Sequence, residues 1–316
     1  MAIDESLVVE VRAVTRETDT IQSYELSRPR GEHLPAFSPG AHIDVQLEAG
    51  MTRSYSLINC ASERTRYVIA VDCVPGGRGG SRWIHGNVRV GQAVSISVPR
   101  NRFPLETSAT HSVLIAGGIG ITPLLAMMRQ LERLQKSWEL HYCVRDINRA
   151  AFLTEMKRSH AHGRVTLHLS GAQGRPNLDS IVRSAPAGTH FYCCGPTGML
   201  QAFEQATACC EPRFVHTERF TGEQAAVAGN FDLVLANCGR TLRVNAGETI
   251  LERLILEGFD VPNSCREGVC GSCEVPLIAG KADHRDMILT AAEKAANTSI
   301  FVCCSGSLTQ SLTLRL

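Results

Sequence analysis

Short stretches in which apolar and polar residues alternate occupy roughly the first third of the chain, with glycine and proline between them. Apolar residues at every second position are typical of strands that bury one face. The alternation predicts an antiparallel barrel or sandwich. Its strands would come from residues 8–12, 21–26, 42–47, 67–71 and 94–98.

A different pattern begins at His111, where short apolar runs alternate with stretches of helical periodicity. The helical stretch after the first run carries leucine and methionine at positions 124, 125, 128, 131 and 134. Repeated strand and helix units predict a parallel sheet with helices on both faces and ligands at the carboxyl ends of its strands. The strands would be residues 113–116, 140–144, 165–169, 190–193 and 214–216.

The stretch 221–229 is small and polar, which is typical of a linker. After it we expect a hairpin from 231–236 and 241–244, a short helix near 249–257, and a final strand at 312–314. The predicted domains are therefore 1–107, 108–222 and 230–316, with the linker at 223–229.

The overall composition is that of an ordinary globular protein. Of its 316 residues, 44% are hydrophobic and 20% are charged, and the net charge of +1 gives no attraction to nucleic acid or an acidic membrane. Met1–Ser6 shows no signal-peptide pattern and no apolar run is long enough to span a bilayer, so we expect a cytoplasmic protein. We also expect the chain to be monomeric on its own. The 13 cysteines are an odd number, and we expect reduced thiols and cofactor ligands.

Three cysteines lie close together near the carboxyl end of the chain. Cys265, Cys270 and Cys273 follow the pattern Cys-x4-Cys-x2-Cys, and Cys303 or its neighbour Cys304 follows at a distance. This spacing is typical of a plant-type [2Fe-2S] cluster. A zinc site usually shows two close Cys or His pairs, and only one is present, but a zinc site or a set of buried thiols stays an alternative.

A glycine-rich loop, Gly117–Pro123, lies directly after a predicted strand and before a predicted helix. Glycines allow a pyrophosphate to approach the backbone, and a helix amino terminus attracts anions. No Gly-Lys-Ser/Thr sequence follows, so a dinucleotide site is favoured over a nucleotidase loop.

An arginine with nearby hydroxyl groups, Arg53–Ser56, ends one predicted strand of the barrel, and a glycine-rich segment, 76–81, follows it. Arginine and hydroxyl groups can hold a ribityl phosphate and the edge of a flavin ring. Taken alone, the same residues would be an ordinary surface strand.

Together with Cys194-Gly195-Pro196, these motifs in this order make the whole chain resemble the phthalate dioxygenase reductase family, and it is similar to vanillate O-demethylase and carnitine monooxygenase reductases. The resemblance implies a six-stranded FMN-binding barrel, an NADH-binding α/β domain and a β-grasp [2Fe-2S] domain. It also implies a Rieske-type terminal oxygenase, acting on aromatic or related substrates, as electron acceptor.

The resemblance also implies roles for individual residues. The FMN site would comprise Arg53, Tyr55, Ser56, Ile69, Ala70, Val71, Gly80 and Ser81, and the NADH site Gly118, Gly120, Thr122, Cys194, Gly195 and Pro196. Ser56, Cys194 and Phe220 would lie at the reacting ring, with Phe220 covering the flavin or else simply packing at a domain junction. The cluster ligands would be Cys265, Cys270, Cys273 and Cys303.

Electron counting explains why these three parts occur together. NADH delivers two electrons as hydride, a [2Fe-2S] cluster accepts one, and a flavin converts between them. A cytochrome P450 or a separate ferredoxin is an alternative acceptor, and a non-catalytic redox sensor or zinc-bound module is an alternative of another class. The segment Asp283–Asp286 has no assigned role beyond a turn or a docking surface.

Overall fold

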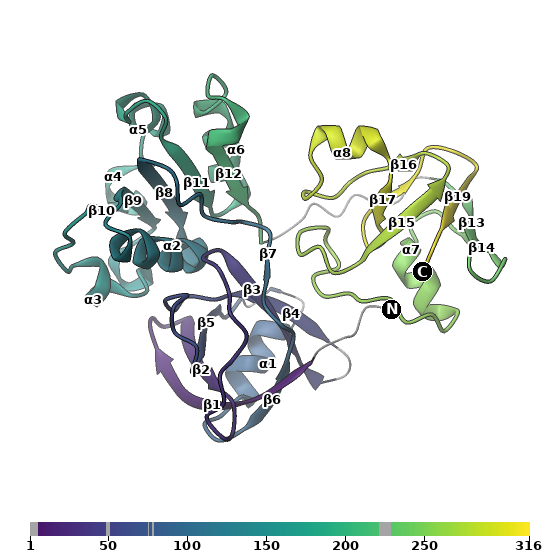
Figure 1. Ribbon diagram of the computed structural model, residues 1–316, viewed down its shortest axis with the longest axis horizontal. Helices are drawn as coiled ribbons and strands as arrows, with labels where there is room; N and C mark the ends of the chain where they lie inside the picture. The colour runs from purple at the N-terminus through teal and green to yellow at the C-terminus, as the bar shows by residue number, and fades with distance from the viewer. Residues whose placement is uncertain (1–5, 49–50, 75, 78, 221–228) are drawn as a thin grey trace. The chain divides into compact units, whose positions relative to one another are not determined.

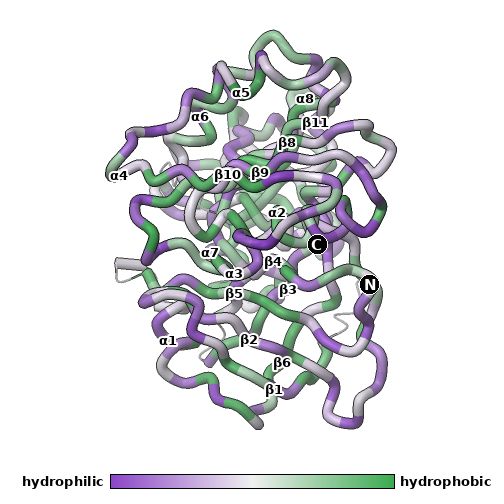
Figure 2. The backbone as a smooth tube through the Cα atoms, turned by 90° about the vertical axis from the view of Figure 1, so that its left-hand side faces the viewer, coloured by the Kyte–Doolittle hydropathy of each residue, from purple (hydrophilic) through white to green (hydrophobic). Residues whose placement is uncertain are grey.

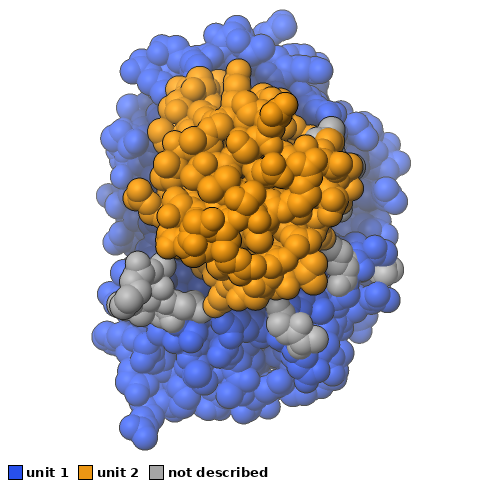
Figure 3. Space-filling model, turned by 90° about the vertical axis from the view of Figure 1, so that its right-hand side faces the viewer, with its two compact units in different colours: residues 1–218 blue, residues 219–316 orange. Residues whose placement is uncertain are grey.

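The computed structural model describes residues 6–48, 51–74, 76–77, 79–220 and 229–316. It divides into two compact units, residues 1–218 and 219–316, which Figure 3 colours separately. The predicted linker, apart from Gly229, lies outside the described residues. No helix in the described part of the chain is long and apolar enough to cross a membrane.

Unit 1 begins with the predicted antiparallel barrel (Figure 1). Its strands follow the order β4-β3-β6-β1-β2-β5, a short β7 pairs with β3, and a bridge between Leu57 and Ile69 joins the end of β4 to β5. Apolar and polar residues are mixed along β1, β2 and β6 (Figure 2), and every second residue is buried along β6 and at Val9 and Val11 of β1. The elements are β1 Leu7–Arg16, β2 Ile21–Ser27, β3 Ala41–Gln46, β4 Thr52–Ser56, β5 Tyr67–Asp72, α1 Gly80–Asn87, β6 Ala93–Ile96 and β7 Arg100–Asn101.

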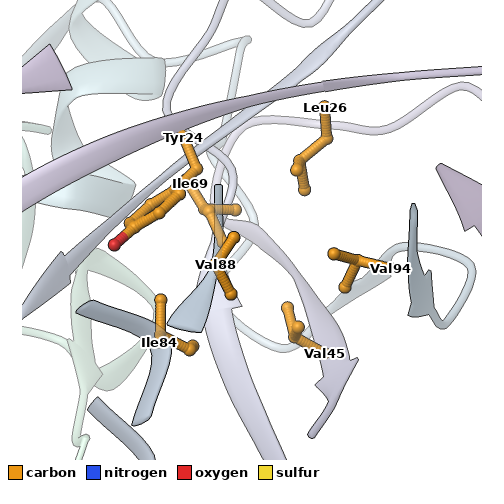
Figure 4. Close-up of a pocket in the computed structure, with 7 residues that line it drawn as sticks. All are labelled: Tyr24, Leu26, Val45, Ile69, Ile84, Val88 and Val94. Atoms are coloured by element: carbon orange, nitrogen blue, oxygen red, sulfur yellow. The ribbon is translucent and has the colours of Figure 1, made fainter. Parts of the chain in front are cut away.

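The barrel core contains a small apolar gap between its strands and α1 (Figure 4). Its volume of about 10 Å³ is at the lower limit for one water molecule, and no polar surface lines it. We therefore expect it to be dry. The side chains of Tyr24, Leu26, Val45, Ile69, Ile84, Val88 and Val94 line it.

The rest of unit 1 is the predicted parallel sheet, with strand order β10-β9-β8-β11-β12. Figure 1 shows α2 on one face and α5 and α6 on the other. The order reverses between β8 and β11, so their carboxyl ends form the crevice where such sheets bind ligands. The elements are β8 His111–Gly117, η2 Gly118–Gly120, α2 Ile121–Arg133, β9 Ser137–Val144, η3 Ile147–Arg149, α3 Leu153–Met156, β10 Gly163–Leu169, α4 Ser170–Gln173, α5 Leu178–Ser184, β11 His190–Cys194, α6 Thr197–Ala206, η4 Pro212–Phe214 and β12 Val215–Glu218.

The barrel and the parallel sheet share one hydrophobic core. Ile58 and Ala70 of the barrel region pack in the same buried cluster as Leu124 of α2. Arg129 of α2 also donates to the carbonyl oxygen of Ile58 and forms an ion pair with Glu155. The shared cluster and the hydrogen bond from Arg129 to Ile58 join the two halves of unit 1.

Unit 2 is a mixed five-stranded sheet, in the order β14-β13-β19-β15-β17, packed on α7. β13 and β19 are parallel and the other neighbours are antiparallel, as in a β-grasp fold, so all three predicted fold classes are confirmed. A capping box of Thr249 and Glu252 starts α7. The elements are β13 Phe231–Leu235, β14 Thr241–Val244, α7 Ile250–Leu256, β15 Glu274–Ala279, β16 Ala282–Asp283, α8 Ala291–Ala296, β17 Ser299–Phe301, β18 Gly306–Ser307 and β19 Ser311–Leu314.

Candidate functional site

The four cysteines predicted as cluster ligands gather on one side of unit 2. The Cys265 thiol interacts with the thiols of Cys270 and Cys303, and the Cys303 thiol also interacts with that of Cys273. All four residues are at least 93% buried, since their exposed fractions are 7%, 5%, 2% and 4% in chain order. The fold thus brings three cysteines of one loop to a fourth that follows β17.

The cluster loop, residues 265–273, turns its backbone N–H groups toward its own sulfur atoms. The Glu267 amide lies 3.3 Å from Cys265 Sγ, and the Cys265 amide lies 3.4 Å from Cys270 Sγ. Gly268 and Gly271 have φ of 71° and 79°, which glycine adopts without strain. N–H groups aimed at sulfur stabilise thiolates and tune an iron–sulfur cluster.

Three of the predicted ligands, Cys265, Cys270 and Cys303, have raised pKa values and so resist ionisation without a metal. A hydrogen bond with Cys265 and burial raise the pKa of Cys270. A hydrogen bond with Cys265 lowers the pKa of Cys303, but interactions with Cys273 and Cys304 raise it overall. Bound cations would supply the missing positive charge, because a coordinating thiol is deprotonated outright.

Among the described residues, no three His, Cys, Asp or Glu side chains are arranged around one point as the ligands of a single ion are. A two-iron cluster requires a different arrangement, because each iron takes two of the four thiolates. The paired contacts of Cys265 with Cys270 and of Cys273 with Cys303 fit that requirement.

The sequence leaves Cys303 and Cys304 as possible fourth ligands, and their side chains have different surroundings. The Cys303 thiol interacts with two other predicted ligands. The Cys304 Sγ lies 3.7 Å from the carbonyl oxygen of Phe301 and would be 2.5 Å from a Cβ added to Gly268. The geometry favours Cys303, although Cys304 also contacts it.

In the barrel, Arg53 lies across the start of α1. A Cβ added to Gly80 would be 2.7 Å from Arg53 Nε, so the close packing of the guanidinium depends on that glycine. Helix α1 begins after Gly79, whose φ is 88°, and its first turn carries no acidic residue. A guanidinium beside a helix amino terminus is a combination that favours a phosphate group.

The two barrel strands predicted to contact the flavin present different faces. On β5, the side chains of Ile69 and Val71 point into the barrel core, and Ala70 points to the core shared with the nucleotide domain. Ile69 and Val71 could therefore flank a ring only through their backbone. On β4, Tyr55 packs against the barrel core and Ser56 is 5% exposed.

The loop Gly117–Gly120 contacts both β5 and the segment after β11. A Cβ at Gly120 would come within 2.5 Å of the Cys194 carbonyl carbon, whereas one at Gly118 would meet nothing within 4 Å. Gly118, with φ of 55°, is therefore the glycine that leaves its surface open to a ligand. Gly120 instead allows the loop to pack against β11.

Thr122 is placed differently from the expectation that it faces a pyrophosphate. Its side chain is 2% exposed and its hydroxyl donates to the Ile119 carbonyl oxygen at 2.9 Å. The threonine fills space at the start of α2 and holds the loop closed. Its backbone N–H, in the first turn of that helix, is the group left for an anion.

Gly195 and Pro196 pack directly on this loop. A Cβ at Gly117 would lie 2.7 Å from Pro196 Cδ, and one at Gly195 would lie 3.1 Å from Gly117 Cα. The ends of β8 and β11 therefore touch through small residues. Cys194, just before this contact, is fully buried.

A residue that the sequence analysis missed, Glu218, lies beside Cys194. Cys194 Sγ is 3.9 Å from Glu218 Oε2. Glu218 is partly exposed as a residue, and burial of its carboxyl group raises its pKa to about 8. Burial and the nearby carboxyl group also raise the pKa of Cys194. At neutral pH the pair is a protonated acid beside a neutral thiol.

Phe220 belongs to unit 2 and is 39% exposed. A large apolar side chain with this exposure is available to cover another surface. Its predicted role over the flavin stays a prediction.

Two family models match the chain. The model described as "2Fe-2S iron-sulfur cluster binding domain" matches residues 235–306, and the model described as "Oxidoreductase NAD-binding domain" matches residues 114–205. They cover the cluster loop and the glycine-rich loop, respectively.

Curated relatives extend over nearly the whole chain. The phenoxybenzoate dioxygenase subunit beta of Ectopseudomonas oleovorans is 47% identical, over 97% of this chain and 96% of its own length. The vanillate O-demethylase oxidoreductase of a Pseudomonas species is 39% identical, over 99% of both chains. The likeness therefore extends over both units of the chain and not over one domain alone.

Solved structures also match nearly the whole chain. Phthalate dioxygenase reductase, whose published description is a modular structure for electron transfer from pyridine nucleotides to [2Fe-2S], superposes with a TM-score of 0.76 at 36% identity, over 99% of this chain and 98% of its own. An intact type IV self-sufficient cytochrome P450 monooxygenase superposes with a TM-score of 0.87 at 37% identity, over 98% of this chain. The present chain spans 41% of that longer protein.

Proposed function

The chain belongs to the phthalate dioxygenase reductase family, and on that premise we propose which residues carry its electrons and which acceptor receives them. It is an NADH-dependent iron–sulfur flavoprotein that uses FMN and a [2Fe-2S] cluster and serves an oxygenase. The assignment of residues and the Rieske type of the oxygenase are our proposals.

One observation carries the assignment. Four buried cysteine thiols gather in unit 2, in a chain whose other unit has a glycine-rich loop at the switch point of a parallel sheet. A cluster that accepts single electrons and a site for a two-electron donor need a flavin between them. We propose Cys265, Cys270, Cys273 and Cys303 as the ligands.

For the flavin, we propose that its phosphate binds at the amino terminus of α1. Arg53 would pair with the phosphate, and the backbone of Gly80 and Ser81 would donate to it, since Arg53 already lies against Gly80. Tyr55 and Ser56 would line the ribityl chain and ring edge from β4. Ala70 and the backbone of its two neighbours would flank the ring from β5.

For NADH, we propose that the pyrophosphate meets Gly118 and the first turn of α2, and that Gly195 and Pro196 place the nicotinamide near Cys194. The contact of β5 with the Gly118–Gly120 loop supports this arrangement, because it brings the proposed flavin strand to the proposed dinucleotide loop. Reacting groups held in place in this way react as if at high local concentration.

Cys194 and Glu218 would act together at the reacting ring. The raised pKa of Glu218, about 8, means that the acid keeps its proton at Oε at neutral pH. No negative charge is then present where a hydride must pass. Phe220 would cover the ring when NADH is absent.

We propose a Rieske-type oxygenase, acting on aromatic or related compounds, as the acceptor. The relatives named for dioxygenase and demethylase systems support this choice, since they match the chain along its full length. A cytochrome P450 is the second candidate, because a chain of this kind forms part of a self-sufficient P450.

Two measurements test the proposal. Visible spectra before and after anaerobic NADH addition should show overlaid flavin and iron–sulfur bands that both bleach. The reduced protein is then mixed with an oxidised Rieske oxygenase and, separately, with an oxidised P450. Reoxidation that is fast and saturable only with the Rieske oxygenase is the expected result. Rapid reoxidation by the P450 alone would overturn the choice of acceptor.

A further inference from the structure

The segment Asp283–Asp286, which had no assigned role, ends in backbone contact with the cluster loop. The Met287 amide donates to the Gly268 carbonyl oxygen at 3.0 Å, and a Cβ at Gly268 would lie 3.1 Å from Asp286 Cα. The backbone of Asp286 therefore touches the loop that carries three of the four proposed ligands. A glycine is required at position 268, because Cys304 Sγ would be 2.5 Å from that Cβ.

The Asp286 side chain is a buried carboxylate in which only one of the two oxygen atoms accepts hydrogen bonds. Its side chain has no exposed surface. Its Oδ2 accepts from the amides of Ile288 and Leu289 at 3.1 and 2.8 Å, whereas Oδ1 has no hydrogen-bond partner. A buried carboxylate without full hydrogen bonding exerts its charge on the surroundings with little screening.

Two cationic or ionisable groups face this carboxylate. Lys294 of α8 donates to the Asp286 carbonyl oxygen at 2.5 Å, and its Nζ lies 3.9 Å from Oδ2. The His284 ring lies with Nδ1 3.8 Å from Oδ1, and neither ring nitrogen has a hydrogen-bond partner. The other charged residues of the segment, Asp283 and Arg285, form their own ion pair.

Gly268 brings this charged pair close to the proposed ligands. A Cβ added to Gly268 would lie 3.1 Å from Asp286 Cα and 2.5 Å from Cys304 Sγ, so both residues pack against this glycine. Cys304 adjoins the proposed ligand Cys303, and Gly268 lies between Cys265 and Cys270 in the cluster loop. A charge at this place therefore acts on an electron added to the cluster that these ligands would hold.

We propose that Asp286 and Lys294 set the reduction potential of the [2Fe-2S] cluster from behind its loop, as positioning residues with opposite electrostatic effects. The Asp286 carboxylate disfavours the added electron and the Lys294 ammonium favours it. The proposal rests on the proposed cluster ligands. A unit charge within about 10 Å, at an effective dielectric constant of about 20, changes such an equilibrium on the order of tenfold.

The test is a spectroscopic redox titration of the whole holoprotein, with every variant measured at the same pH. Asp286→Asn keeps the shape and an acceptor for the two amides but removes the charge, and Lys294→Gln removes the opposing charge. We expect Asp286→Asn to raise the potential and Lys294→Gln to lower it. A tenfold change in the equilibrium corresponds to 59 mV for one electron.

Asp232→Asn is the matched control, because it removes the same charge from an exposed ion pair with Arg243 in the same unit. It should leave the potential unchanged. Potential shifts of the same sign in Asp286→Asn and Lys294→Gln, or no shift in Asp286→Asn, would overturn the proposal in favour of a structural role. If Asp286→Asn does not hold the cluster, Lys294→Gln decides: a lower potential supports the proposal, and an unchanged or higher potential overturns it. A wild-type protein without an iron–sulfur spectrum would instead refute the proposed function.

Discussion

Gly120 has no space for a side chain, and this gives a sharp prediction for the dinucleotide loop. A methyl group there would lie 2.5 Å from the Cys194 carbonyl carbon, where ordinary contact begins at 3.4 Å. The Cys194 carbonyl is part of the backbone in a buried region and cannot rotate away from the methyl group. Gly120→Ala must therefore push the loop or the end of β11 by about 1 Å. A displacement of that size at a reacting centre can reduce a rate by about a hundredfold.

The assay is anaerobic stopped-flow reduction of the bound flavin over a range of NADH concentrations. Gly120→Ala should slow the limiting rate by about a hundredfold, with the visible spectrum of the resting protein unchanged. Gly118→Ala is the comparison, since its Cβ meets no protein atom and would lie at the proposed pyrophosphate surface, so it should raise the NADH concentration needed for half-saturation and leave the limiting rate near that of the wild type. Equal effects of the two substitutions on the limiting rate would refute the reasoning from close packing.

Three further predictions concern the other parts of the site. The pKa of Glu218 in the folded state, about 8, is above its ordinary 4.5, so the folded state loses stability as pH rises from 4.5 to 8. Glu218→Gln should therefore stabilise the protein by up to a few kcal/mol at pH 8 and hardly at all at pH 4.5. A difference in urea-unfolding midpoint between wild type and variant that is the same at both pH values would contradict this. Arg53→Ala should weaken FMN binding about 10- to 100-fold, measured by fluorescence during dilution, and retention of wild-type affinity would remove Arg53 from the phosphate site. Cys303→Ser should abolish the iron–sulfur spectrum in a metal-replete preparation while Cys304→Ser retains it, and the reverse outcome would make Cys304 the ligand.

The fold was predictable wherever one pattern dominated a segment. The five runs of the nucleotide domain are strands within a few residues. The three central strands, β8, β9 and β11, are largely buried and therefore mostly apolar, which made them easy to recognise. The barrel was harder. Strand β1 continues to Arg16, well past the predicted end at Arg12, because its register shifts between Val11 and Ala13 and the shift interrupts the alternation.

The candidate site was predictable only in part, because several of its features depend on packing between distant segments. The spacing of the cluster cysteines is local and specific, and it indicated the loop. Glu218 gave no signal, since a charged residue at the end of a short strand is usually solvated. Its raised pKa arises from burial beside Cys194, which is 24 residues away in the sequence. Thr122 fits an anion site by sequence, but its hydroxyl serves the loop itself.

The core shared between the barrel and the nucleotide domain bears on how such chains can be recombined. Ile58 and Ala70 are buried together with residues of α2, so a gene break near residue 107 would leave two fragments with exposed apolar surfaces. The buried cluster of unit 2, in contrast, contains only residues from Phe231 onward. A crossover between Glu218 and Phe231 would divide no hydrophobic cluster of the described residues. Exchange of whole electron-exit modules between reductases should therefore succeed at this boundary, and flavin and nucleotide modules should be inherited together.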